Sequence, residues 1–458
     1  MKKIVTFVIA CCAALASQAE GYQVNTLSTK QMGMGHTGVA LKLGSESMLF
    51  NPAGMAFSDK TLDVSASVSG VAPKSTAYLP DGSSWSTHAP VSTPLMASAS
   101  FRIFDGLQGG VAFYTPYGSG IEWLDNWPGA VLNQRCTLRA FTLQPSVAWR
   151  PLPGLSVGVG LMMTWGNVNL DKGLVTASSM DALLGALEAA GTGAAMGIPA
   201  GYRFGTTTPA SVNLRGSAKP AFGVNVGAMY DITKQITVGV NFRSKMNMTV
   251  EAGTAAVRYA DELAMAILQK DLGIINQANF HAEMPCPYVL SFGAAYRPHE
   301  RWTIAADAQL TGWNAYKSLD VEFLDERLRP YDQHIEKDYR NSWTFKAGAQ
   351  FAATSRLDLR AGLMVDTTPV PDDHYNPETP GTTKINPSAG FSFRPVKGLS
   401  VDFALMYVAG LNANNRRCQY VDLLAASNPA LGLPPVSTFE ASYHIRAWSP
   451  SLGVSYSF

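Results

Sequence analysis

The chain has 458 residues, of which 15% are charged, 47% hydrophobic and 10% aromatic. Its mean hydropathy of +0.03 is too low for a bundle of membrane helices, each of which needs about 20 consecutive apolar residues. The apolar content is too high for a disordered chain, and the 41 Gly and 27 Pro follow no collagen period. The composition therefore predicts a folded chain built mainly from strands.

The N-terminus has the pattern of a secretory signal peptide, predicted over residues 1–19. A short basic start is followed by an apolar run over residues 4–15 and by a small-residue cleavage site at 17–19. The apolar run continues past Cys11, which argues against a lipoprotein cleavage box at that cysteine. We therefore expect export, with a mature chain that begins at residue 20.

The mature chain would be close to neutral. Loss of Lys2 and Lys3 leaves 33 basic residues against 34 acidic ones, so no basic field is available for nucleic acid. The remaining cysteines, Cys136, Cys286 and Cys418, are too widely spaced to predict a disulfide framework or a zinc site. The sequence predicts neither a nucleic-acid partner nor a metal.

Apolar residues alternate with small or polar ones along several long segments. In the last segment Trp448, Leu452, Tyr456 and Phe458 would share one face and serines most of the other, and residues 343–351 repeat the pattern. These runs approach the roughly 9–11 residues that a tilted strand needs to cross a bilayer. Strands of soluble sandwiches average only about 5–6 residues. One face of each long strand is therefore apolar enough for lipid.

The alternation predicts fourteen strands, and the connections between them are alternately short and long. The strands cover residues 61–70, 94–104, 107–117, 138–149, 155–167, 218–230, 236–250, 286–297, 301–318, 341–352, 356–366, 384–394, 399–410 and 440–458. Within hydrocarbon only a closed barrel satisfies every backbone group of such strands. We predict an all-β fold: a transmembrane antiparallel β-barrel over residues 60–458, in the bacterial outer membrane and in contact with its lipid. The terminal strand, which ends at Phe458, would be recognised by the barrel assembly machinery.

Residues 20–59 precede the first strand and show no alternation of strand length. Gly33, Gly35 and Gly38 follow one another too closely for a stable helix. The segment could hang free in the periplasm, or it could fold back into the barrel as a plug.

Short motifs are spread along most of the mature chain. Before the barrel lie residues 21–25, the glycine run 33–38 and the triplet Asn51-Pro52-Ala53. The barrel itself contains residues 113–118, 310–316 and 365–371, the last with the sequence Val-Asp-Thr-Thr-Pro-Val-Pro. Together these motifs resemble the FadL family of outer-membrane long-chain fatty acid transporters. The resemblance implies that residues 20–59 form an N-terminal hatch that plugs the barrel.

The resemblance also implies a transport mechanism. A hydrophobic ligand would be captured in a groove between extracellular loops 168–217 and 251–285, pass to an internal site and leave sideways at a kink in the third strand. Each loop has a helical stretch with an apolar side, so the expected ligand contacts are Leu183, Leu187, Leu263 and Ile267.

The kink is expected at Pro116, Tyr117 and Gly118. Pro116 lacks an N–H for the strand ladder, and Gly118 allows a departure from the pleat. The family resemblance further implies that Asn51, Pro52 and Ala53 of the hatch contact this gap.

Several charged residues, Lys245 among them, are expected to point into the barrel, and three of these cations are candidate ligand contacts: Arg243, Lys346 and Arg360. A fatty carboxylate could pair with them, and arginine offers a bidentate fork. Alternatively, these cations brace the barrel through ion pairs, as Asp358 could do for Arg360. The sequence leaves both interpretations open.

Signals for an enzyme are weak. Residues 154–158 fit GxSxG, but strand alternation continues where a nucleophile elbow requires a strand-to-helix turn. The histidines have no metal-ligand spacing. We predict no catalytic residue, no cofactor and no metal site. Two alternatives to fatty acid import remain: an importer of aromatic hydrocarbons, for which the internal cations would be dispensable, and a structural or adhesin-type surface barrel without transport.

Overall fold

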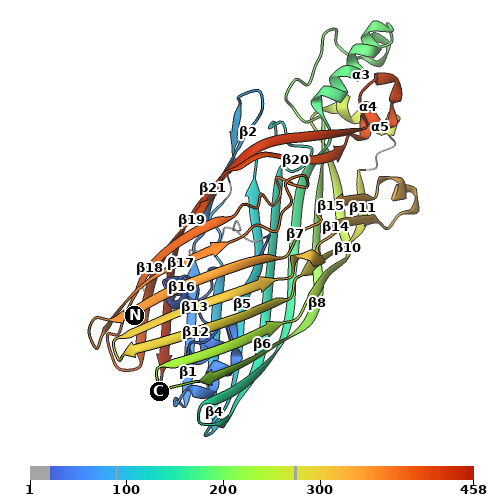
Figure 1. Cartoon of the computed structure of the whole chain (residues 1–458). Helices are drawn as coiled ribbons and strands as arrows, with labels where there is room; N and C mark the ends of the chain where they lie inside the picture. The colour runs from blue at the N-terminus through green and yellow to red at the C-terminus, as the bar shows by residue number, and fades with distance from the viewer. Residues whose placement is uncertain (1–20, 89, 273–275) are drawn as a thin grey trace, which may run out of the picture.

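The computed structural model describes residues 21–88, 90–272 and 276–458 (Figure 1). The predicted signal peptide, residues 1–19, lies outside these ranges. Strands dominate the described chain, and they form one hydrogen-bonded sheet. Within the described ranges no helix combines the length and the apolar character needed to span a membrane.

Fourteen strands close into an antiparallel ring. In order around the barrel they are β1 (Leu62–Ser69), β4 (Leu95–Phe104), β5 (Leu107–Glu122), β6 (Arg135–Leu152), β7 (Leu155–Val175), β8 (Ala210–Asp231), β9 (Ile236–Arg243), β12 (Val289–His299), β13 (Trp302–Thr311), β16 (Ser342–Ala352), β17 (Leu357–Asp366), β18 (Lys384–Phe393), β19 (Leu399–Gly410) and β21 (Val436–Ser457). The ring closes because β21 pairs with β1, with Ala66 opposite Val454. Each strand predicted from alternation overlaps one member of this ring, which confirms the predicted β-barrel.

The alternation of side chains follows the predicted pattern. On β16 the rings of Trp343 and Phe345 point outward and are 39% and 51% exposed. The residue that follows each of them, Thr344 and Lys346, points inward and is buried. The outer surface of the barrel is therefore apolar and the inner surface polar. This distribution is typical of a barrel that faces lipid.

The two ends of the barrel differ. At one end the connections are tight, and Gly106 and Gly398 take the left-handed φ values of +83° and +84° that their turns require. At the other end several strands continue far beyond the ring (Figure 1). Short turns at one end and long excursions at the other match the predicted arrangement of connections.

The two predicted loops, 168–217 and 251–285, are shorter than expected. β7 and β8 stay paired up to Val175↔Ala210, so only residues 176–209 connect them. The second loop is largely taken up by β10 (Met246–Tyr259) and β11 (Gln277–Cys286). The loop bounds were wrong because paired strands extend past the ring, satisfying each other's backbone groups there.

Further short elements lie beyond the ring. The additional strands are β2 (Ala72–Tyr78) and β3 (Ser84–Ser86), β14 (Ser318–Phe323) and β15 (Gln333–Glu336), and β20 (Ala413–Val421). The α-helices there are α3 (Ala177–Ala189), α4 (Glu262–Leu272) and α5 (Leu423–Ser427), and the 3-10 helices are η3 (Ala194–Met196), η4 (Trp313–Ala315), η5 (Glu326–Tyr331) and η6 (Pro429–Leu431). The predicted strands 236–250 and 301–318 were too long: the first is divided between β9 and β10, and the second ends with β13. The short strands escaped prediction because pairing with a neighbour, rather than their own alternation, makes them strands.

The N-terminal segment, residues 21–58, lies inside the barrel (Figure 1). It forms α2 (Thr29–Met32), η1 (Gly44–Leu49) and η2 (Pro52–Phe57). α2 contacts β1, β18, β19 and β21, η1 contacts β1, β4 and β5, and η2 contacts β5, β6, β7 and β8. All but four of residues 21–56 are buried. Contacts with strands on all sides show that the segment fills the end of the barrel that has the tight turns.

Candidate functional site

The barrel wall is irregular at Pro116 of β5. The pairing of β5 with β4 stops at Tyr114, and its pairing with β6 shifts register between Tyr114 and Tyr117. Proline has no N–H to give to a ladder. The irregularity lies where the sequence predicts the kink, although its use as an exit stays a prediction.

The N-terminal segment takes over the backbone partners that β4 leaves. The N–H of Val24 donates to the Pro116 carbonyl at 2.9 Å, and the N–H of Gly118 donates to the Tyr22 carbonyl at 2.8 Å. A single antiparallel bridge, Gln23↔Tyr117, lies between these bonds. Residues 22–24 thus cover the break in the wall.

Asn51 anchors the N-terminal segment elsewhere. Its Nδ2 donates to the carbonyls of Val39 at 2.8 Å, Ala228 at 3.1 Å and Val240 at 3.3 Å. Its Oδ1 accepts from the N–H of Ala53 at 3.2 Å and so caps η2. One buried amide therefore joins the segment to both β8 and β9.

The predicted contact of Asn51, Pro52 and Ala53 with the gap at strand three was wrong. The Ala53 carbonyl accepts from Ser156 Oγ of β7 at 2.6 Å, so the triplet lies against β7–β9 and not at the β5 kink. Glycines on the inner wall decide this position, because a Cβ on Gly227 would lie 2.0 Å from the Asn51 Oδ1. A triplet motif carries no information about which wall offers that space.

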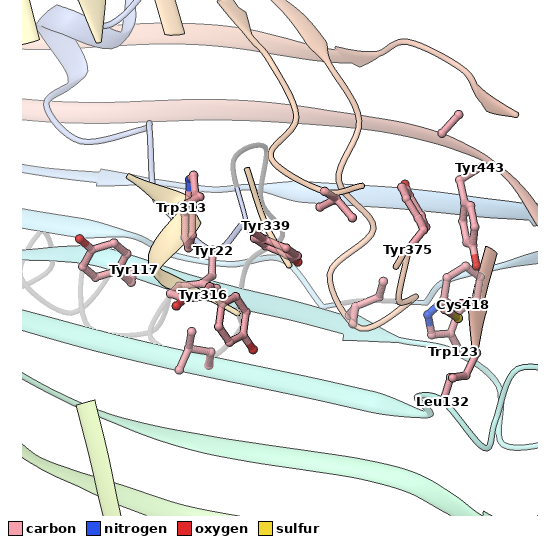
Figure 2. Packing of buried hydrophobic residues seen from close by; sticks show 14 of the residues in the cluster. Tyr22, Tyr117, Trp123, Leu132, Trp313, Tyr316, Tyr339, Tyr375, Cys418 and Tyr443 are labelled. Atoms are coloured by element: carbon pink, nitrogen blue, oxygen red, sulfur yellow. The ribbon is translucent and has the colours of Figure 1, made fainter. Parts of the chain in front are cut away.

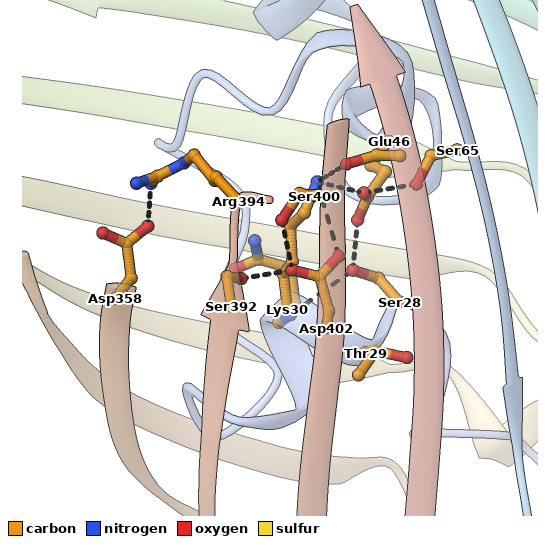
Figure 3. Close-up of polar contacts among 12 residues, drawn as sticks. Ser28, Thr29, Lys30, Glu46, Ser65, Asp358, Ser392, Arg394, Ser400 and Asp402 are labelled. Atoms are coloured by element: carbon orange, nitrogen blue, oxygen red, sulfur yellow. Dashed lines mark hydrogen bonds and ion pairs between the residues drawn. The ribbon is translucent and has the colours of Figure 1, made fainter. Parts of the chain in front are cut away.

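A buried charge cluster holds α2 against the barrel wall near β19, β21 and β1, where the ring closes (Figure 3). Lys30 Nζ lies 3.0 Å from a carboxylate oxygen of Glu46 and 3.9 Å from one of Asp402 on β19. Glu46 also accepts from the hydroxyls of Ser28 and Ser65. Burial opposes ionisation of Glu46, but Lys30 and these hydroxyls together hold its pKa below the ordinary value.

Arg360 belongs to a neighbouring cluster. It donates to Ser392 at 2.5 Å and to Gln350 at 2.8 Å, and its guanidinium lies 3.7 Å from the Asp358 carboxylate. Arg394 also pairs with Asp358 (Figure 3). These contacts fit the bracing interpretation of Arg360, and its contact with ligand stays a prediction.

Arg243 and Lys346 line a small inner cavity of about 30 Å³ beside the kink. Tyr117 and His36 also face this cavity. Lys346 Nζ donates to Gln309 at 2.8 Å. The structure thus brings two of the three predicted cations to the break in the wall. Arg360 is separate from them. It lies opposite Gln350 of β16, which is four positions, or roughly 13 Å, along the strand from Lys346.

His36 is the polar group of the N-terminal segment at this cavity. It is 6% exposed, and neither ring nitrogen has a hydrogen-bond partner in the described chain. Burial, the charge of Lys346 and the charge of Arg243 hold the pKa of His36 well below its ordinary value. A neutral imidazole next to two cations offers one donor and one acceptor to a small polar group.

An aromatic layer lies farther out in the barrel (Figure 2). It consists of Tyr22, Tyr117, Trp123, Trp127, Trp313, Tyr316, Tyr339, Tyr375 and Tyr443. Ring centroids lie 4.7 Å apart for Tyr22 and Trp313 and 5.1 Å apart for Tyr316 and Tyr339. The close ring contacts fill the barrel above the N-terminal segment.

A larger outer cavity of about 490 Å³ lies beyond the aromatic layer. Its lining is mainly aliphatic, with polar groups at a few points. The lining includes Leu170, Leu174, Val212, Leu214, Val257, Val321, Phe323, Ile335 and Leu423, together with Lys172, His334, Glu336, Asp373, His374 and Asn376. Volume and character are those of a site for a hydrophobic small molecule.

Lys172 is the residue of this cavity that the sequence analysis missed. It lies on the extension of β7 between Leu170 and Leu174 and shares their inward face. Its ammonium makes no hydrogen bond or ion pair with the described residues, although Glu378 and Lys337 act on it electrostatically. The alternation of residues 168–175 could have revealed it, had that segment been assigned to the strand.

The predicted groove residues lie elsewhere. Leu183 of α3 and Ile267 of α4 are buried in one apolar cluster, and Leu187 and Leu263 pack against it. None of the four lines the outer cavity. The two helices therefore use these side chains to pack together with α5, and their contact with ligand stays a prediction.

Comparisons with known proteins agree with this architecture. Residues 10–458 match the family model described as outer membrane protein transport protein (OMPP1/FadL/TodX). The chain is 22% identical to the long-chain fatty acid transport protein of Escherichia coli O6:H1, over 87% of this chain and 89% of that one. It is 21% identical to outer membrane protein P1 of Haemophilus influenzae, over 76% and 72%.

Solved structures share the fold. A FadL homologue of Pseudomonas aeruginosa superposes with a TM-score of 0.76 at 18% identity, covering 96% of this chain and all of that one. The P. putida toluene transporter TodX gives 0.66 at 17% identity, covering 96% and 99%. The chain therefore belongs to the OMPP1/FadL/TodX family: it is an outer-membrane transport protein for hydrophobic compounds, and not an enzyme.

Proposed function

We propose that this chain imports long-chain fatty acids, or amphiphilic carboxylates of similar shape. The proposal rests above all on Lys172, an ammonium without an ion-pair partner among the described residues, beside Leu170 and Leu174 in a mainly aliphatic outer cavity. A carboxylate could pair with Lys172 while its alkyl chain lies against Leu170 and Leu174. Burying an unpaired charge is costly, so a cavity for uncharged hydrocarbons would gain nothing from this lysine.

The proposed route has three stages. Ligand enters the outer cavity, passes the aromatic layer to the inner cavity with Arg243 and Lys346, and leaves sideways at the break around Pro116. The N-terminal segment is the hatch of this route. Residues 22–24 are its movable part, since they are the residues bonded to β5 at the break. Asn51 and Lys30 hold the remainder in place.

An importer of aromatic hydrocarbons is the second candidate. It is supported by the aliphatic lining of the outer cavity and by the similar fold of solved toluene transporters. In that case Lys172 would be dispensable.

Two further partners fit the barrel. We propose that the apolar outer face contacts outer-membrane lipid. Recognition of the terminal strand by the barrel assembly machinery would use Phe458, which is 56% exposed.

Uptake of labelled oleate and labelled toluene tests the proposal, in an outer-membrane host that lacks its own importer. A charge-assisted hydrogen bond contributes about 1.5–3 kcal/mol, so Lys172→Met should lower oleate uptake roughly 10- to 100-fold at limiting ligand and leave toluene uptake unchanged. Lys219→Met, which removes an exposed ion pair with Glu251, is the control. Uptake of toluene alone would favour the second candidate. No uptake of either by an assembled barrel would leave the structural or adhesin-type barrel.

A further inference from the structure

The connection between β17 and β18, residues 367–383, folds into the barrel. The Pro369 carbonyl accepts from the N–H of Arg340 at 2.9 Å, and the N–H of Tyr375 donates to the Arg417 carbonyl at 2.9 Å. The Pro377 carbonyl accepts from the indole of Trp123 at 3.0 Å. Hydrogen bonds thus join this connection, which we call the inner loop, to three separate parts of the extracellular end.

A buried ion pair secures the inner loop. Lys337 Nζ donates to the Glu378 carboxylate, and the two side chains are 0% and 6% exposed. Asn376 Oδ1 accepts from the Glu378 N–H at 2.9 Å, and the hydroxyl of Thr379 lies 2.9 Å from that of Tyr339. A buried pair adds little net stability, but removal of one partner leaves an uncompensated charge. Separation of the two side chains would therefore leave both charges uncompensated.

The inner loop lies between the two cavities. Asp373, His374 and Asn376 face the outer cavity. On the other side Thr379 contacts Tyr339, which belongs to the aromatic layer, and that layer continues through Tyr22 to Tyr117 at the inner cavity. Figure 2 shows the rings that fill this part of the barrel. The loop and the aromatic layer thus lie together between the two cavities.

The outer cavity is coupled to the ion pair by charge. Lys172, which faces the cavity, is within the electrostatic range of both Glu378 and Lys337. A carboxylate bound to Lys172 would add a negative charge that repels Glu378 and attracts Lys337. In a poorly solvated interior this effect is strong, whereas an uncharged ligand in the same cavity would not produce it.

We propose that the inner loop is a gate, held shut by the Lys337–Glu378 pair and released when the carboxylate of an amphiphilic ligand occupies the outer cavity. This inference rests on the proposed function, since it assumes that the ligand is a carboxylate. It adds a second closure, distinct from the N-terminal segment, that distinguishes an acid from a hydrocarbon of the same length.

Hydrogen exchange by the full-length protein in lipid nanodiscs tests the gate. Glu378→Gln should speed exchange in residues 372–379 at least about tenfold, because Lys337 is left with an uncompensated buried charge and the loop loses one of its attachments, while residues 28–57 exchange as before. Asp338→Asn is the matched control, because that carboxylate lies next to Lys337 but is 59% exposed, pairs with the exposed Lys317 and does not line the outer cavity. In the double variant Lys337→Met with Glu378→Leu, slow exchange should return. Oleate should speed exchange of the loop in the parent, methyl oleate should not, and Lys172→Met should abolish the response to oleate.

Unchanged exchange in Glu378→Gln would show that the Lys337–Glu378 pair does not hold the loop. An equal increase of exchange in residues 28–57 would show general loosening of the protein instead of a gate. If oleate does not change the exchange of the loop in the parent protein, a bound carboxylate does not release the gate. Uptake of oleate by cells with the same protein separates this inference from the proposed function. Uptake without any change in exchange overturns the gate alone, whereas the absence of both overturns both.

Discussion

The backbone N–H of Val24 donates to the carbonyl of Pro116 at 2.9 Å, so the N-terminal segment is bonded directly to the irregular point of the barrel wall. Pro116→Ala supplies the missing N–H and removes the proline ring from the point where the register of β5 with β6 shifts, so a regular ladder with β6 becomes possible. We expect the break to close and oleate uptake to fall to the level of the empty host, with equal or greater thermal stability. Pro145→Ala on β6, where the register is regular, should leave uptake unchanged. Normal uptake by Pro116→Ala would place the exit elsewhere.

Asn51 should be important for the position of the N-terminal segment. Asn51→Ala removes the donors to Val39, Ala228 and Val240, and the unpaired buried carbonyls should cost about 1–3 kcal/mol. Asn51→Asp should cost more, because it turns a carboxylate oxygen toward these carbonyls. Faster hydrogen exchange in residues 44–57 would show the effect. The exposed Asn314→Ala serves as control, and equal exchange in both variants would contradict this role.

Glu46 should make the plug sensitive to acid. Its pKa is lowered in the fold, so its contribution is present above the unfolded value near 4.5 and is lost as the pH falls through the folded value. Above that value Glu46→Gln should loosen the segment by up to about 3–5 kcal/mol, because Lys30 loses its nearest carboxylate, and the difference from the parent should vanish at lower pH. Liposome swelling in small sugars would measure the leak. The Lys42–Asp231 pair, whose side chains are 26% and 23% exposed, provides the control, since Asp231→Asn should cost under about 1 kcal/mol.

His374 should have the opposite pH dependence. Partial burial disfavours its charge, but Asp373 at 3.0 Å and Glu336 at 3.3 Å hold its pKa above the ordinary value of 6.5. The stabilisation is therefore complete below pH 6.5 and is lost as the pH rises through the folded value. Thermal unfolding of the parent and His374→Gln between pH 5 and 8 should differ most at the acid end. His444→Gln, at a position without an ion pair in the described ranges, should show no such trend, and a constant difference for His374→Gln would rule out the coupling.

Local patterns in the sequence predicted the barrel. Trp343, Phe345 and Leu452 face outward as alternation requires, because successive residues of a strand point to opposite faces and lipid accepts only apolar ones. Pro116 was likewise predictable, since the lack of an N–H is a property of one residue. These features depend only on each residue, on the residues next to it in the sequence and on the bilayer.

Contacts between distant segments were not predictable. Asn51 lies on β8 and β9 because glycines far along the chain leave space there. The short strands beyond the ring exist because a partner strand offers an edge to pair with.

The sequence by itself determined the export signal pattern, the alternating strands and the position of the kink, all of which are set within a few residues. Only the tertiary structure decided which charges are paired. Among the described residues Lys172 has no ion-pair partner and Lys337 has a buried one, because β7, residue 378 and the aromatic layer meet in three dimensions. The desolvation and Coulomb energies of these charges depend on their burial and on the distances between them in the folded chain, and the spacing of residues along the sequence does not determine either.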